Sequence, residues 1–289
     1  MDIRTILLPF TSTPGDKAAM ELAFVIANKY RSNVHGLHVR MDPRDIAPLA
    51  GEGLSGAMIE EMMESAEKEG MEHSSAARRM FDEYCKSKGI PFVEEPPGPG
   101  GVSASWHTEI GREEDVVSWH GRLHDIIVIS RPAEGQEKST TEVVHAALMD
   151  AGRPLMLAPP EAPSDIGKRV AVAWNGSREA AKSIAAARPI LMQADEVYIL
   201  TAEEGYSHGP GAADVARYLS WYDVRPELRQ FGGSSPQDIG GSLLSKLNEL
   251  GADMLVMGAY THSRLRHLIL GGVTSHVVSN AMMPVFMHR

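Results

Sequence analysis

One structural pattern occurs twice in this chain, and this repeat limits the folds that its 289 residues can adopt. Residues 4–12 are a short apolar run that ends in small polar residues, and a helical pattern follows from Asp16. The same order recurs at residues 168–177, where an apolar run ends in Asn175 and Ser177 before a second helical pattern. Ser177 is a predicted N-cap, because its hydroxyl oxygen can accept a hydrogen bond from the first helical turn. The repeat predicts two copies of one unit.

The ends of the two halves also correspond. Asp125 precedes a buried-strand pattern that matches the one after Asp253, and each pattern leads through a loop and a helix to a final strand. These final strands begin near Pro154 and Pro284. Each half is therefore expected to begin and end with the same elements.

Strand and helix patterns alternate within each half, which predicts parallel strands joined by helical crossovers. We expect an α/β fold of two tandem, doubly wound parallel-sheet domains, with ligands at the carboxyl ends of the strands. The Pro-rich residues 158–167 have the composition of a linker, so the predicted domains are 1–160 and 161–289. In the second half, strands are expected near residues 169–174, 196–201, 224–230, 253–258 and 284–288, and helices near 178–192, 211–221, 236–250 and 272–282.

Composition excludes several classes of function. The formal net charge is −10, which argues against a nucleic-acid-binding protein, since phosphate contacts need clustered Lys and Arg. The apolar runs fall short of the roughly 18 residues that a membrane span needs. The single cysteine, Cys85, excludes a disulfide framework and fits a reducing compartment. We expect a cytoplasmic protein without membrane or nucleic-acid partners.

The segment from Gly258 to Thr274 has the strongest pattern of a binding site. It follows an apolar strand and contains Gly271 and Gly272 where the last helix is expected to begin. Glycines let a backbone approach a ligand closely, and the free N–H groups of a helix N-terminus bind phosphate. Arg264, together with Arg266, could add charge-assisted hydrogen bonds to the same oxygen atoms.

These residues resemble the signature of the universal stress protein family. ATP-binding members carry a glycine, two residues, a second glycine, nine residues, and a third glycine followed by Ser or Thr. Gly258 and Gly271 match the first and third glycines, Thr261 replaces the second, and Gly272 replaces the Ser or Thr. The resemblance implies an adenine-nucleotide alpha hydrolase-like, or Rossmann-like, fold for both halves.

The resemblance extends to the first strand of the second half. The family places an Asp and a Ser at its end, and this chain has Asn175 and Ser177 there. An amide lacks the charge that would hold a metal ion, so support for Mg²⁺ is weak. The resemblance implies ATP or another adenine nucleotide as the ligand, bound by Asn175, Ser177, Gly258, Thr261, Arg264, Gly271, Gly272, Val273 and Thr274.

The first half lacks these features. No glycine is found where the helix after Ser130 begins, and Glu134 and Glu137 in this segment would repel phosphate. Thr11 stands where the family has its Asp. We expect a degenerate first domain that is a structural partner of the second.

Other candidate sites are weaker. The 12 histidines are scattered along the chain and are expected to be solvated or close to the ligand, so no metal site is expected. Residues 106–109 with Trp119 and His120 are expected to pack around the third strand. The Met-rich segment 54–88 is expected to pack its methionines on its own domain, and a partner-binding surface is the alternative.

Three functions stay open at this point. The first is a stress-response module that binds an adenine nucleotide in its second domain without strong catalysis. The second is a weak ATP-hydrolysing enzyme, although no residue set provides a nucleophile with a general base. The third is a ligand-free protein-interaction scaffold. The family's paired units associate through their last strands, so strands near 154–158 and 284–288 are expected to form an internal pseudo-dimer, and a further homodimer stays open.

Overall fold

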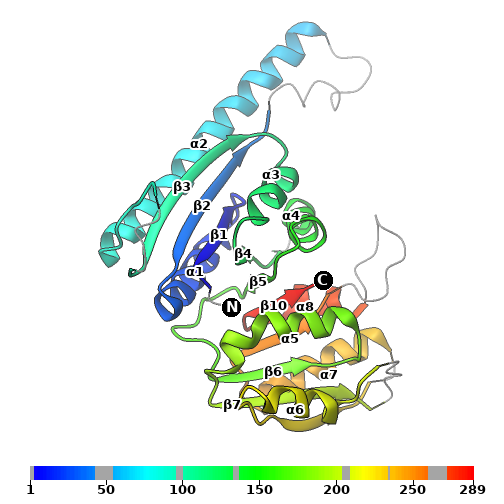
Figure 1. Cartoon of the computed structure of the whole chain (residues 1–289). Coiled ribbons are helices and arrows are strands. Elements are labelled where there is room, and N and C mark those ends of the chain that lie inside the picture. Colours follow the sequence, from blue (N-terminus) through cyan, green and yellow to red (C-terminus); the bar gives the residue numbers. More distant parts are fainter. Residues whose placement is uncertain are drawn as a thin grey trace.

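A computed structural model describes residues 3–42, 55–95, 100–132, 137–203, 209–233, 235–259 and 272–289. Their strands form one ten-stranded sheet in the order β3-β2-β1-β4-β5-β10-β9-β6-β7-β8 (Figure 1). The strands are β1 Thr5–Phe10, β2 Asn33–Arg40, β3 Ser103–Ile110, β4 Ile126–Ser130, β5 Leu155–Ala158, β6 Arg169–Ala173, β7 Glu196–Ala202, β8 Glu227–Phe231, β9 Met254–Gly258 and β10 Val285–His288. The helices are α1 Asp16–Tyr30, α2 Gly56–Lys88, α3 Glu113–Gly121, α4 Glu137–Asp150, α5 Arg178–Leu191, α6 Ala212–Ser220, α7 Pro236–Glu249 and α8 Gly272–Asn280.

The two halves of the sheet repeat the same topology. The first half has the order β3-β2-β1-β4-β5, and the second half has the corresponding order β8-β7-β6-β9-β10. Neighbouring strands are parallel within each half, as the alternation of strands and helices predicts. In the middle of the sheet β5 and β10 pair antiparallel, with Met156 opposite Phe286. The expected pairing of the last strands is therefore confirmed, and the two predicted sheets are joined into one.

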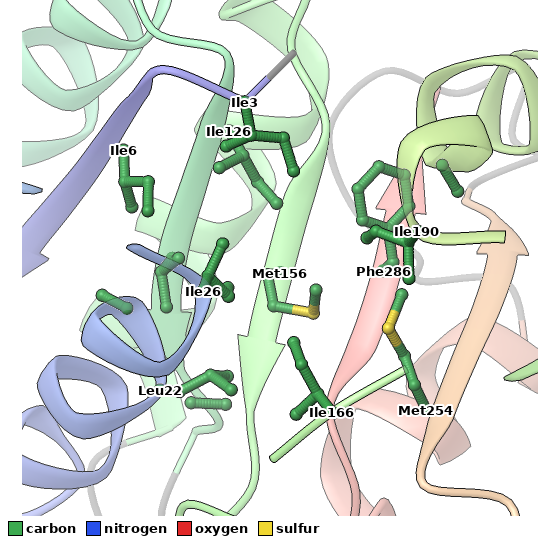
Figure 2. Packing of buried hydrophobic residues seen from close by; sticks show 14 of the residues in the cluster. Ile3, Ile6, Leu22, Ile26, Ile126, Met156, Ile166, Ile190, Met254 and Phe286 are labelled. Carbon is green, nitrogen blue, oxygen red and sulfur yellow. The ribbon is translucent and has the colours of Figure 1, made fainter. Parts of the chain in front are cut away.

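Helices cover both faces of this sheet. Helices α1, α2, α5 and α6 pack on one face, and α3, α4, α7 and α8 pack on the other. Figure 2 shows the apolar cluster on the face covered by α1, α2, α5 and α6, at the place where the two halves meet. Met156 on β5 and Phe286 on β10 lie there between Ile26 and Ile190. Because this apolar cluster is continuous across the β5–β10 pair, burial of apolar surface holds the two halves together.

The corresponding aspartates of the two halves have the same role. Asp125 accepts a hydrogen bond from the backbone nitrogen of Thr5, at 3.0 Å, at the start of β1. Asp253 accepts one from the backbone nitrogen of Lys168, at 2.8 Å, just before β6. Each carboxylate thus fixes the first strand of its half against the strand that the aspartate precedes.

Helix α2 packs on the sheet only near its C-terminal end. Its methionines at positions 58, 62 and 71 are 49%, 42% and 48% exposed, so the expected packing of the Met-rich face is wrong for them. Met80, nearer the end, packs against the core as expected. The buried residues of this helix are Ala77, Phe81 and Cys85. Among the described helices, none is long and apolar enough to span a membrane.

Candidate functional site

The candidate site lies where the strand order of the second half reverses. After β6 the chain continues to β7 on one side, whereas β9 lies on the other side of β6. Strands β6 and β9 are parallel neighbours, with Ala173 opposite Met257, so the segments that follow them begin at adjacent positions on the same edge. This edge is where open α/β sheets bind ligands. Asn175, Ser177 and Gly258 of the predicted set lie at this edge.

Hydrogen bonds hold the loop after β6 in one conformation. The side-chain oxygen of Asn175 accepts a bond from the backbone nitrogen of Ser177, at 3.2 Å. The hydroxyl oxygen of Ser177 accepts one from the backbone nitrogen of Ala180, at 3.1 Å, which confirms the predicted N-cap of α5. The indole N–H of Trp174 donates to the carbonyl of Pro210, at 2.8 Å. Since the capping bond uses Ser177 as an acceptor, its hydroxyl hydrogen can still be donated to a ligand.

Gly258 allows the end of β9 to touch the first turn of α5. A Cβ atom at this position would lie 2.5 Å from the backbone nitrogen of Ala180 and 2.8 Å from the carbonyl carbon of Glu179. Both atoms belong to backbone, so they could not move aside without shifting the helix. Gly258 therefore has a packing role of its own, in addition to any role in ligand binding.

Sequence reasoning missed Ser183, which connects α5 to two strand ends. Its buried hydroxyl group donates to the carbonyl of Met257, at 2.8 Å, and accepts from the backbone nitrogen of His288, at 3.0 Å. A serine at this position of an apolar helix face resembles any small core residue in sequence. Only the neighbouring strand ends show that its hydroxyl group positions the edge of the sheet.

The last helix begins where the glycine-rich segment predicts. Gly272 is the first residue of α8, Val273 packs against the core, and Thr274 is buried. The predicted residues Thr261, Arg264 and Gly271 lie outside the described residues. Helix α8 thus has its N-terminus at the end of the segment that follows β9.

Basic side chains predominate at the start of α5. Arg178 is exposed and forms an ion pair with the buried Glu179, at 2.8 Å. Lys182 donates to the carbonyl oxygen of Arg289, at 3.2 Å. Burial, with a smaller contribution from Lys182, lowers the pKa of His288. The position that a metal-binding Asp would take is held by Asn175, so this loop brings no carboxylate of its own for a metal ion.

In the first half, the carboxylate of Asp16 lies at the corresponding strand end. Asp16 is buried at the start of α1 and accepts hydrogen bonds from the backbone nitrogens of Thr11 and Thr13, at 3.2 and 3.3 Å. Burial raises the pKa of Asp16, and burial followed by the charge of Asp16 raises the pKa of Glu113 to about 8. Glu134 lies outside the described residues, and the side chain of Glu137 is not described. Two acidic groups at this edge disfavour a phosphate ligand.

Residues 237–289 match the family model described as Universal stress protein family. This C-terminal part of the chain is similar to the universal stress protein family. Its match to the model covers the segment that contains Gly258, Gly271 and Gly272, where the sequence resemblance is strongest. Comparison with curated protein sequences gives no match.

Solved structures share the universal stress protein fold over the whole chain. A universal stress protein from Archaeoglobus fulgidus DSM 4304 is 17% identical, with a TM-score of 0.66 over 100% of this chain and 97% of that one. A putative universal stress protein from Pseudomonas aeruginosa UCBPP-PA14 is 13% identical, with a TM-score of 0.58 over 99% and 93%. A functionally unknown protein from Pseudomonas aeruginosa PAO1 is 13% identical, with a TM-score of 0.58 over 99% and 92%. At these identities the likeness is one of fold.

Proposed function

We propose that this chain is a stress-response module whose second domain binds an adenine nucleotide, with ATP as the first candidate, and has no strong catalytic activity. The observation that supports this most is the position of the β6 and β9 ends. They lie side by side at the reversal of strand order, and α8 begins at Gly272 after the glycine-rich segment that follows β9. A helix N-terminus supplies N–H donors and a favourable dipole for phosphate oxygens.

Two features of α5 also favour an anionic ligand at this edge. Arg178 and Lys182 place two cationic side chains in its first turns, against one acidic side chain, Glu179, which pairs with Arg178. The Ser177 hydroxyl group can donate to a ligand oxygen while its oxygen still caps α5. The first domain has Asp16 and Glu113 at the equivalent edge, so the proposal assigns one nucleotide to each chain. A cytoplasmic location remains a prediction from the composition.

Binding without strong catalysis follows from Asn175. Phosphoryl transfer needs carboxylates that hold Mg²⁺ or a residue that orients the attacking water, and an amide at this position supplies no charge. Slow ATP hydrolysis is the alternative for the same site. Phosphate release from ATP distinguishes the two. If the protein only binds the nucleotide, it should release no more phosphate than the Gly272→Asp variant does, whereas a hydrolysing site should release more.

The direct test is isothermal titration of ligand-stripped protein with ATP, with and without Mg²⁺. One site per chain with micromolar affinity is the expected result. Two sites per chain would show that the first domain also binds. An absence of binding heat, together with no nucleotide released when the freshly purified protein is denatured, would reject the proposal.

A matched pair of variants locates the site. Gly272→Asp places a carboxylate at the N-terminus of α8 and should weaken ATP binding at least tenfold, since it repels the phosphate groups. Gly56→Asp makes the same change at the first residue of α2, where a Cβ atom would meet nothing within 4 Å, and should leave binding unchanged. Equal affinities in the two variants would exclude the α8 N-terminus from the site.

A protein-interaction scaffold is a second candidate, favoured by the exposed methionines of α2. Adaptable Met side chains occur on surfaces that bind several partners. Replacing Met58, Met62 and Met71 with Gln should abolish capture of a partner in a pull-down, whereas Gly272→Asp should not. The opposite pattern would indicate that partner binding depends on the nucleotide site.

A further inference from the structure

A cluster of histidines lies on the first domain, far along the sheet from the candidate nucleotide site. Side chains alternate between the two faces of β3. Trp106 lies on the face covered by α2, where its ring centroid is 5.3 Å from that of Phe81. His107 and Glu109 lie on the opposite face, beside His120 of α3. Trp106 thus packs around the third strand as expected, whereas Trp119 is 53% exposed and the polar neighbours of Trp106 form a separate group.

The ligand atoms of this group lie close enough together to share one metal ion. One atom each from His107, Glu109 and His120 lies within 4.8 Å of the other two. The Nε2 atom of His107 is 3.5 Å from Oε2 of Glu109, and the Nε2 atom of His120 is 2.7 Å from the same oxygen. Ligands about 2.0–2.1 Å from a tetrahedral zinc ion lie about 3.4 Å from one another. The first separation matches this value, and the second has to lengthen.

We propose that His107, Glu109 and His120 bind a divalent transition-metal ion, with Zn²⁺ as the first candidate. Two imidazoles and one carboxylate suit a borderline-soft cation such as zinc and leave a fourth position for water. The three residues come from a sheet-edge strand and the helix that follows it, so a bound ion would connect β3 to α3.

When no metal ion is bound, a hydrogen atom lies between Nε2 of His120 and Oε2 of Glu109. The carboxylate of Glu109 can only accept, so the 2.7 Å contact with His120 is an Nε2–H donor bond. Metal binding would replace this hydrogen, because a ligating imidazole must offer a lone pair. Only a small side-chain movement is needed to lengthen this contact, since His107 is exposed and His120 and Glu109 are half-buried.

Further histidines stand beside the three ligands. The ring centroid of His35 on β2 lies 6.1 Å from that of His120 and 5.3 Å from that of His124. The hydroxyl group of Ser105 donates to the Asn33 amide oxygen, at 2.9 Å, and therefore accepts from Nδ1 of His35, at 2.9 Å. This bond leaves the Nε2 lone pair of His35 available to a metal-bound water.

Among the described residues of the second half, no counterpart of this cluster occurs. Strand β8 corresponds to β3 and carries Glu227 and Arg229, which form an ion pair with each other. Neither β8 nor α7 contains a histidine. The proposed metal site is therefore separate from the nucleotide site and belongs to the first unit of the repeat.

The test is metal titration of tag-free, EDTA-treated full-length protein. Zn²⁺ is followed by calorimetry, and Co²⁺ by its visible absorption, which reports the coordination geometry. We expect one ion per chain, with binding weakened at least tenfold in His107→Ala, Glu109→Gln and His120→Ala. His73→Ala is the matched control, since His73 forms a His–Glu pair with Glu69, at 4.0 Å, on α2. This control should bind as the unaltered chain does.

Three results would overturn the proposal. The first is that the unaltered protein binds no ion at a one-to-one ratio. The second is that the His107→Ala/His120→Ala double variant binds the metal as tightly as the unaltered protein does. The third is that His73→Ala weakens binding as much as the ligand variants do. The altered residues are exposed or half-buried and lie on two separate elements, so far-ultraviolet circular dichroism of each variant should match that of the unaltered protein. If one variant unfolds, the variant on the other element still decides the outcome.

Discussion

The Asp16 carboxylate accepts hydrogen bonds from both the hydroxyl group and the backbone nitrogen of Thr11, at 3.0 and 3.2 Å. This contact places a carboxylate of the chain at the end of β1, where the second half has the uncharged Asn175. It also brings negative charge close to Glu113, which contributes to the raised pKa of Glu113. The stability of the first domain should therefore depend on pH.

Glu113→Gln should make the protein less sensitive to alkaline pH. Burial first, and the charge of Asp16 second, raise the pKa of Glu113 from 4.5 to about 8. Because the folded state holds this proton more tightly than the unfolded state does, its contribution to stability is complete below pH 4.5. It is lost as pH rises toward 8. Urea unfolding at pH 5 and pH 9 should show a fall in the free energy of unfolding on the order of a few kcal/mol, reduced in the variant.

Glu114→Gln is the control for this experiment. Glu114 is the next residue along α3 and forms an ion pair with Arg112 at the surface. The control should keep most of the pH dependence of the unaltered protein, because the charge of Glu114 is the smallest of the three contributions to the raised pKa of Glu113. A Glu113→Gln variant with the same pH dependence as the control would contradict the assignment.

Gly258→Ala should destabilise the second domain. The new Cβ atom would lie 2.5 Å from the backbone nitrogen of Ala180, so α5 or β9 must shift, at a cost of about 1–3 kcal/mol. Gly70→Ala is the matched control, because a Cβ atom there meets nothing within 4 Å and alanine favours the helix. Thermal unfolding should show a lower melting temperature for the first variant and an equal or higher one for the control. An unchanged melting temperature for Gly258→Ala would rule out the close contact.

Ser183→Ala should also lower stability, through lost hydrogen bonds. The change removes the donor to the Met257 carbonyl and the acceptor for the His288 backbone nitrogen. Leaving buried polar groups without partners costs about 1–3 kcal/mol. Ser220→Ala removes an exposed hydroxyl group at the end of α6 and should change the free energy of unfolding by less than about 0.5 kcal/mol in urea titrations. Similar losses in both variants would mean that Ser183 does not connect α5 to the strand ends.

Cys85 should react slowly with thiol reagents in the folded protein. It is completely buried, and burial, with a smaller contribution from Asp82, raises the pKa of its thiol to about 12. Since the thiolate is the reactive form, labelling with iodoacetamide at pH 8 should be at least tenfold slower than in guanidinium-unfolded protein. Equal rates in the folded and unfolded protein would show that the end of α2 opens readily.

The sequence predicted the repeat and most of its elements, because both are written in local patterns. The predicted strands of the second half near 169–174 and 253–258 correspond to β6 and β9, and the helix near 178–192 corresponds to α5. Continuous apolar runs, helical spacing of apolar residues and capping residues such as Ser177 are patterns that extend over only a few residues. The correspondence of Asp125 and Asp253 was also visible in the sequence, whereas their hydrogen bonds to the first strand of each half were not.

Helix α3 was not predicted from the sequence. It has nine residues, and its buried side chains are too few to form a clear helical period. The methionines of α2 were misjudged for a related reason. Their spacing is that of a helix that buries one face, but the sequence does not say where the sheet beneath the helix ends.

The sequence by itself thus determined the two units, most of their elements and the glycine-rich segment after β9. The tertiary structure alone decided the contact of Gly258 with α5, the bonds of Ser183 and the grouping of His107, Glu109 and His120. The physical reason is that local periodicity fixes which face of each element is buried. Contacts between elements depend on strand order and register, which bring together residues that are far apart in the chain.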